Sequence, residues 1–113
     1  MGRLRELCMG LPEVTERVSH GAPAWFVRDK KMFVMWVGFH HGNSREAFWC
    51  AAPVGVQEEM VGEDPERFFR PPYVGHRGWL GVYLDGEVDW TEVGEIVRDA
   101  YRVVAPRKLA AEM

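Results

Sequence analysis

The pattern of hydrophobic and polar positions predicts that the chain opens with a short helix and continues into strands. Over residues 3–10 the apolar side chains recur at helical spacing, and Pro12 ends the helix shortly afterwards. Residues 24–28 are rich in aromatic and β-branched types, which predicts a strand followed by a tight turn at 29–30. Residues 32–39 are apolar on both alternating faces, so we expect a central strand that is covered on two sides.

The middle of the chain predicts more strands, interrupted by one short helix. A polar loop at 40–44 leads into a third strand at 46–52, and antiparallel hairpins join these strands into a meander. We expect a short acidic helix at residues 56–61 and a turn at 64–66. A fourth strand follows at 79–84, and a second turn at 85–86 ends it.

The last third of the chain predicts a long amphipathic helix. Asp89 supplies an acceptor at the N-cap, and Glu92 follows three residues later, as in a capping box. Over residues 90–104 apolar side chains recur every three or four positions, and charged side chains take the other side. Pro106 then begins a short terminal helix. Strands and helices are largely segregated along the chain, which predicts an α+β fold: a two-layer sandwich of a meander sheet with helices packed on it.

Size and composition favour one domain over residues 1–113 with a single core. Hydrophobic residues make up 47% of the chain, which is too apolar for a disordered protein. The only cysteines are Cys8 and Cys50, without a CxxC motif or a basic-then-apolar leader, so we expect a cytoplasmic protein. The longest mainly apolar run, 32–39, is far shorter than the roughly 20 residues of a membrane-spanning helix.

Charge is unevenly distributed along this chain. The net charge of −3 argues against a protein that wraps nucleic acid over its whole surface. Residues 67–84 nevertheless contain three arginines and no acid, and residues 17–45 hold five Lys and Arg against Asp29 alone. If the turn at 29–31 and the loop at 70–78 meet at one end of the sheet, an anion-binding face follows. The alternative is a set of scattered, solvated charges.

The segment FRPPYVGHRGW at residues 69–79 combines cationic, aromatic and turn-forming residues. Gly75 and Gly78 can adopt positive φ, so the backbone N–H groups between them could form a nest for a phosphate or carboxylate. Arg77 could then clamp the anion while Tyr73 or Trp79 offers a flat face to a base. The alternative is structural: the prolines stiffen a crossing, and both rings pack into the core.

The candidate ligand-binding residues share a cationic or aromatic side chain and are Lys30, Lys31, Arg70, Tyr73, His76, Arg77, Trp79, Arg102 and Lys108. We assign no catalytic residue and expect no cofactor. An imidazole can act as a general acid or base near neutral pH, but the spacing of the sequence identifies no partner that would orient His76. His40 and His41 could ligate a metal, but adjacent residues on a strand point to opposite faces, and no Cys or carboxylate completes a recognisable ligand set. We therefore predict no metal site there.

Three segments resemble the MmcQ/YjbR family: SHGAPAWF at 19–26, PPYVGHRGW at 71–79 and YRVVAPRKL at 101–109. The middle segment, with its GHxGW core before a strand, is the most specific of the three. The resemblance implies a small bacterial protein with a two-layer fold similar to bacterial frataxin (CyaY), and DNA binding as the function. Iron binding of the frataxin kind would require a carboxylate-rich first helix, whereas residues 3–10 contain only Glu6.

These observations lead to a hypothesis of a non-enzymatic module that binds DNA or another nucleic acid through a local basic and aromatic face. The first alternative is a protein or enzyme that binds a small anionic metabolite through the His76-Arg77 loop. The second is a protein-interaction domain with exposed aromatic anchors. We expect a monomer or a weak homodimer without membrane contact.

Overall fold

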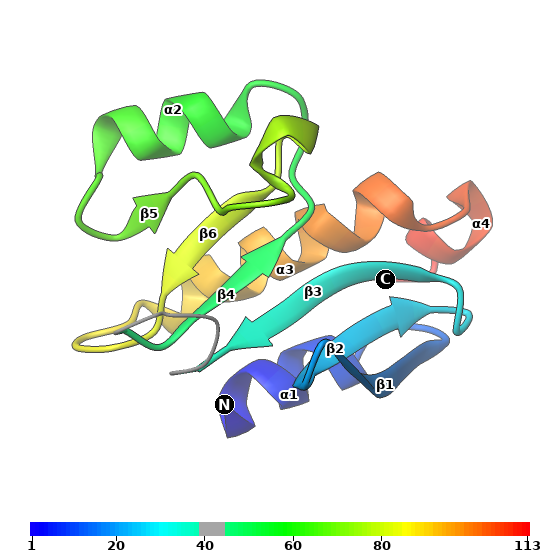
Figure 1. Ribbon diagram of the computed structural model, residues 1–113. Coiled ribbons are helices and arrows are strands. Elements are labelled where there is room, and N and C mark those ends of the chain that lie inside the picture. Colours follow the sequence, from blue (N-terminus) through cyan, green and yellow to red (C-terminus); the bar gives the residue numbers. More distant parts are fainter. Residues whose placement is uncertain (39–44) are drawn as a thin grey trace.

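The structure, a computed structural model, describes residues 1–38 and 45–113 (Figure 1). Six strands form one antiparallel sheet in the order β1-β2-β3-β4-β6-β5, which confirms the α+β fold. The elements are, in chain order, α1 (Gly2–Met9), β1 (Val14–Ser19), β2 (Ala22–Val27), β3 (Lys31–Val37), β4 (Ala47–Cys50), α2 (Val56–Glu63), β5 (Phe68–Phe69), the 3-10 helix η1 (Gly75–Arg77), β6 (Leu80–Tyr83), α3 (Trp90–Val104) and α4 (Arg107–Ala110).

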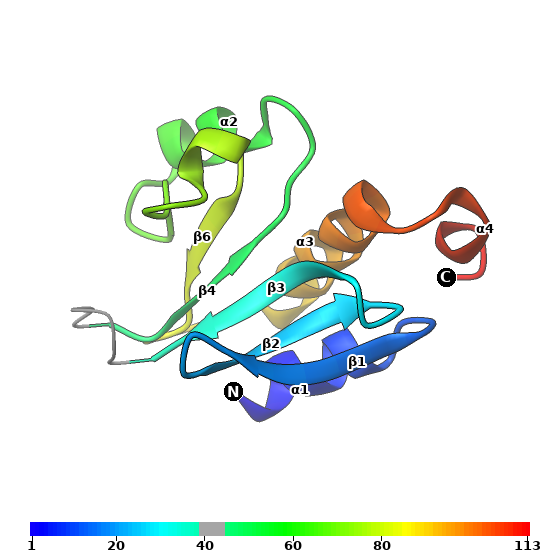
Figure 2. The same ribbon diagram turned by 45° about the vertical axis from the view of Figure 1, so that its right-hand side comes forward.

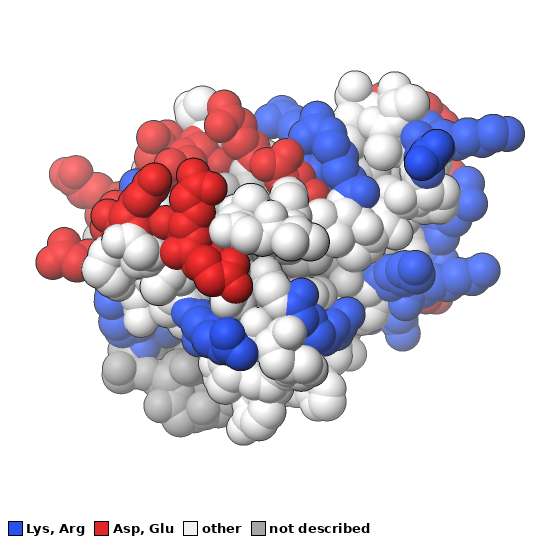
Figure 3. All heavy atoms as spheres, turned by 90° about the horizontal axis from the view of Figure 1, so that it is seen from above, with Lys and Arg blue, Asp and Glu red and all other residues white. Residues whose placement is uncertain are grey.

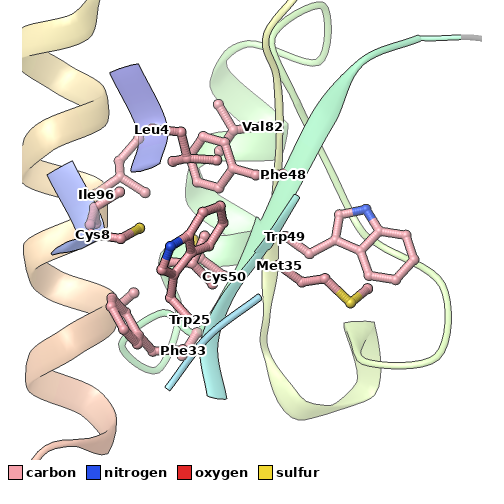
Figure 4. Close-up of a cluster of buried hydrophobic side chains, with 14 of the residues drawn as sticks. Leu4, Cys8, Trp25, Phe33, Met35, Phe48, Trp49, Cys50, Val82 and Ile96 are labelled. Atoms are coloured by element: carbon pink, nitrogen blue, oxygen red, sulfur yellow. The ribbon is translucent and has the colours of Figure 1, made fainter. Parts of the chain in front are cut away.

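Helices α1 and α3 pack on the same face of the sheet and form the second layer (Figures 1 and 2). The apolar stripe predicted for residues 90–104 is the buried side of α3. In the close-up, Cys8 of α1 and Ile96 of α3 lie on the same side of the sheet as Phe33 and Phe48 (Figure 4). On the opposite face, Tyr73 and Val74 of the segment before η1 line a cavity together with Met35 and Trp49, and α2 packs beside β5.

A β-bulge in β3 changes which side chains face each layer. Trp25 of β2 pairs with Val34, and the next residue of β2 pairs with Met32, so Phe33 is an extra residue without a partner in β2. Phe33 and Cys50, the partner of Val34 in β4, both lie on the helix side. Because the bulge shifts the alternation, Met32 and Met35 both lie on the other face, where they line one cavity.

The strands at the two edges of the sheet were missing from the predicted set. Strand β1 reads Val-Thr-Glu-Arg-Val-Ser, and its side chains are exposed or half-buried, so it carries no continuous apolar signal. Strand β5 has only two residues, too few for any periodicity. The predicted end of the central strand at Phe39, the loop at 40–44 and the His40-His41 pair lie outside the described residues.

The helix ends follow the local signals with small shifts. The Asp89 carboxylate accepts hydrogen bonds from the backbone N–H groups of Thr91 and Glu92, which confirms the predicted N-cap of α3. Pro106 is the N-cap of α4 rather than its first residue. Within the described residues, no helix has both the length and the apolar character needed to cross a membrane.

Both cysteines belong to the packed interior. Cys8 and Cys50 are completely buried and unbonded, and they lie between the sheet and its helices (Figure 4). Burial is the main reason why the pKa of each thiol lies well above its ordinary value. Neither thiol is therefore a nucleophile near neutral pH, in agreement with the predicted packing role.

Candidate functional site

The turn between β2 and β3 and the segment before β6 come together beside the end of α3. Lys30 and Lys31 from the turn and Arg77 from η1 line one cavity of about 380 Å³. The other described lining residues are Met32, Trp79, Val103 and Val104, so this lining contains no carboxylate. We call this space the basic cavity. The turn at 29–31 and the loop at 70–78 thus meet, as the anion-binding hypothesis requires.

A tight turn projects the two lysines into the basic cavity. Arg28 and Asp29 have positive φ angles of 53° and 57°, and the Lys30 N–H donates to the Val27 carbonyl over 3.0 Å. Positive φ at both central residues is typical of type I′ hairpin turns, although it costs residues other than glycine about 1 kcal/mol. Arg28 also donates to Glu13, and Arg17 pairs with Asp29. These ion pairs brace the turn against β1, and the two lysines follow it at the start of β3.

Gln57, which the sequence reading missed, fixes the segment that carries Arg77. Gln57 lies in α2, and its side chain is buried. Its Nε2 donates to the carbonyl of Gly75 over 2.9 Å and to the carbonyl of Trp79 over 2.5 Å. One amide thereby connects both ends of the segment to α2. The only indication in the sequence was that Gln57 lies on the inward side of a short helix. A buried amide must form hydrogen bonds, but the sequence does not identify its acceptors.

Two of the backbone N–H groups in the predicted nest around His76 are already occupied. The N–H of Arg77 donates to the Val74 carbonyl, and the N–H of Gly78 donates to the Gly75 carbonyl, each over 3.0 Å. Both groups are therefore used inside η1 and cannot bind an anion. Gly78 has the expected positive φ of 83°, but Gly75 does not. Gly75 is needed for space instead, since an added Cβ would lie 2.7 Å from Cγ of Arg70.

Some of the lysine and arginine side chains in the predicted basic segments form salt bridges with carboxylates, and others do not. Five arginines that contributed to the predicted basic segments or sites bind carboxylates: Arg17, Arg28, Arg45, Arg67 and Arg102. Lys30, Lys31, Arg70 and Arg77 form no salt bridge with any residue in the described ranges 1–38 and 45–113. Three of these four cations line the basic cavity, and Arg3, Arg98, Arg107 and Lys108 likewise form no salt bridge among the described residues.

The surface view shows the same segregation at the scale of the molecule (Figure 3). Acidic side chains gather on the left of this view, on the side where α2 lies. Lysine and arginine side chains gather on the right, toward α4 and the β2–β3 turn, with a few more between the two regions. On this face the cations of the right-hand side are therefore largely separate from the main group of acidic side chains.

The aromatic candidates occupy opposite environments. Trp79 is 3% exposed, and the Arg77 guanidinium lies 5.3 Å from the centre of its ring, so the ring is part of the core and is covered by a cation. Tyr73 is 81% exposed and has a positive φ of 66°. The predicted packing role is correct for Trp79 and wrong for Tyr73, and only Tyr73 has a ring available for stacking.

The remaining predicted residues lie outside the basic cavity. Arg70 and His76 are exposed on the segment before β6, but neither belongs to the cavity lining. Arg102 donates to Asp99 over 2.9 Å, and Lys108 is exposed on α4. No hydrogen bond or ion pair joins His76 to another side chain in the part of the chain that the structure describes. A histidine without an orienting partner offers no general acid–base pair.

Comparison with known proteins agrees with this fold. A search of curated proteins found no match. The crystal structure of the Deinococcus radiodurans protein DR2400, described as a DUF419 domain, is similar with a TM-score of 0.76 and 20% identity, over 96% of this chain and 83% of that chain. The model of the YjbR family matches residues 9–103, which include both turns that build the basic cavity. The chain therefore belongs to the YjbR family.

Proposed function

We propose that this chain is a non-enzymatic binding module that engages nucleic acid through the basic cavity. The observation that carries the proposal is the convergence of Lys30, Lys31 and Arg77 around one cavity whose described lining holds no carboxylate. Three cations held close together repel one another, and a bound phosphate relieves that repulsion. The guanidinium of Arg77 can also bind a phosphate through two hydrogen bonds at once.

Exposed Tyr73 lies on the same segment as Arg77 and supplies the second element of such a site. Base stacking on an aromatic ring beside a cationic groove is the common arrangement in proteins that bind single strands without sequence preference. The net charge of −3 restricts the contact to this local face, because the rest of the molecule repels phosphate.

The test is a titration of labelled single-stranded and double-stranded oligonucleotides, followed by fluorescence anisotropy at several salt concentrations. Affinity should fall as salt rises, and both Arg77→Ala and the double variant Lys30→Ala/Lys31→Ala should weaken binding. If neither oligonucleotide binds at low salt, the proposed function is wrong.

Arg3→Ala is the matched control because it removes the same charge elsewhere. The Arg3 guanidinium lies 5.3 Å from the ring centre of Trp90 at the start of α3, whereas Val103 and Val104 of the basic cavity lie at its end. The 15 residues of α3 separate the two places by roughly 20 Å. This variant should bind like the unmodified protein.

A small anionic ligand is the second candidate, and the size of the basic cavity favours it. A volume of about 380 Å³ falls within the range of small-molecule pockets, about 300–1,000 Å³. Thermal-shift measurements with nucleotides, sugar phosphates and organic acids separate the two candidates, since a saturating ligand stabilises the folded protein that binds it. A shift that Arg77→Ala abolishes, without binding of either oligonucleotide, would select the small ligand.

A further inference from the structure

A second cavity, of about 460 Å³, lies on the face of the sheet opposite to α1 and α3. Its described lining residues are His20, Met32, Met35, Trp49, Tyr73 and Val74, and we call it the methionine cavity. Figure 4 shows Met35 and Trp49 projecting to this side, away from the core that the helices cover. The bulge at Phe33 is the reason why both methionines face it.

The chemistry of the methionine cavity suits a flat aromatic ring. Methionine side chains are flexible and polarizable, and their sulfur atoms make favourable contacts with ring edges. Trp49 adds an aromatic surface, and its buried indole N–H has no acceptor among the described residues. Such an unsatisfied donor costs free energy, which an acceptor on a bound molecule would recover.

The rim of this cavity includes one residue with an uncommon backbone conformation. Tyr73 has a positive φ angle of 66°, outside any two-residue hairpin turn, which is uncommon for a residue other than glycine. The strained backbone at Tyr73 accompanies a ring that is 81% exposed, although burial of this ring would stabilise the fold. An aromatic side chain kept at the mouth of an apolar cavity is in place to cover a bound ring.

The methionine cavity adjoins the basic cavity, because Met32 lines both. Tyr73 and Arg77 also belong to one short segment, the first facing the apolar space and the second the cationic one. A ligand that fills both spaces must carry an apolar ring with hydrogen-bond acceptors and an anionic group a short distance away. A nucleotide has this composition: every base has acceptors on its edge, and a sugar joins it to a phosphate.

We infer that the two cavities form one site for a single nucleotide unit, with the base in the methionine cavity and the phosphate held by Lys30, Lys31 and Arg77. Where the nucleotide belongs to a nucleic-acid strand, this inference rests on the proposed function and refines it. Bases inside a duplex are stacked and paired, so only an unpaired base can enter the cavity. The site therefore selects single strands, or free nucleotides of the same chemistry, over duplexes.

The decisive comparison uses two single-stranded oligonucleotides of equal length, one with bases and one in which every base is absent. Both carry the same phosphates. We expect the abasic strand to bind about tenfold more weakly, because stacking of even one base contributes that much. Equal affinity of the two strands would overturn the nucleotide site while leaving phosphate binding, and hence the proposed function, intact.

A thermal-shift measurement with a mononucleotide shows whether the site binds a free nucleotide or a nucleotide within a strand. Stabilisation by the mononucleotide that depends on both Tyr73 and Arg77, without oligonucleotide binding, supports the composite site for a free nucleotide and refutes the strand-binding function. If the mononucleotide and both oligonucleotides fail to bind, the site and the function are both refuted.

Three variants assign the two halves of the site. Tyr73→Ala removes an exposed ring, and Trp49→Phe keeps a ring but removes the indole N–H; each should weaken the base-containing strand several-fold and leave the abasic strand unchanged. Arg77→Ala should weaken both strands. Val54→Ala, at a fully exposed residue outside either described lining, is the control and should change neither affinity. If Tyr73→Ala and Trp49→Phe both leave the ratio of affinities unaltered, the base does not occupy the methionine cavity.

Discussion

Single side chains fix the geometry of this fold by connecting several elements. Glu16 accepts two hydrogen bonds from Arg5 and one from the Trp25 indole N–H, and so connects α1, β1 and β2. The Arg5 guanidinium is the main reason why the pKa of Glu16 lies below its ordinary value. Gln57 plays the corresponding role for the segment that carries Arg77.

Gln57→Met tests this role, because methionine has a similar length and volume but no donor. The carbonyl of Trp79 would lose its side-chain donor, and we expect the free energy of unfolding to fall by about 1–3 kcal/mol. Urea unfolding measures the loss, and amide hydrogen exchange should show faster opening at residues 75–79. Glu59→Gln, on the exposed side of the same helix, is the control. Unchanged exchange at 75–79 would show that Gln57 does not fix this segment.

At the scale of the element, α3 depends on its N-cap as well as on its apolar stripe. Asp89 satisfies two of the N–H groups that have no partner at the start of a helix. The carboxylate of Glu92 is engaged by Arg67 and does not complete a capping box. One cap therefore stabilises the helix whose far end, at Val103 and Val104, lines the basic cavity.

Asp89→Ala should lower the free energy of unfolding by about 1 kcal/mol, within a range of about 0.5–2 kcal/mol. Asp89→Asn keeps an acceptor and should retain most of the stability, which separates the hydrogen bonds from the charge at the helix terminus. Thermal and urea unfolding of the three proteins provide the comparison. Equal losses in both variants would assign the effect to the negative charge.

At the scale of the whole molecule, ion pairs determine how many cations a polyanion meets. Arg45 pairs with Asp85, 40 residues away, and Arg67 pairs with Glu92, 25 residues away. The local excess of arginine in the sequence therefore overstates the free positive charge. What remains at the basic cavity is Lys30, Lys31 and Arg77.

This number predicts the salt dependence of nucleic-acid binding. For a single strand, the logarithm of affinity falls with the logarithm of salt concentration with a slope of about −0.7 for each phosphate that is neutralised, so three cations give about −2. Arg77→Ala should reduce the magnitude of the slope by about 0.7, and Arg3→Ala should leave it unaltered. A slope near −5 would mean that cations outside the basic cavity also contact the strand, contrary to the proposed site.

The sequence alone was sufficient for the segments whose periodicity is strong. The central strand, the cap and stripe of α3 and the α+β class all follow from neighbours within one turn or one strand. The type I′-like turn at Arg28-Asp29 was expected at nearly the right place, and the resemblance of residues 71–79 to the YjbR family was correct. These features depend on contacts that are local in the chain.

Tertiary structure decided the features that depend on partners far away in sequence. Edge strands β1 and β5 became recognisable only through their pairing with β2 and β6, because β1 has no continuous apolar pattern and β5 is too short to show one. The exposure of Tyr73, the bulge at Phe33 and the pairing of five arginines likewise depend on how the layers pack. The types of residue that bind anions could be predicted from the sequence. Which cations share one cavity was decided only when folding brought Lys30, Lys31 and Arg77 together and paired some other arginines, such as Arg45 and Arg67, with carboxylates.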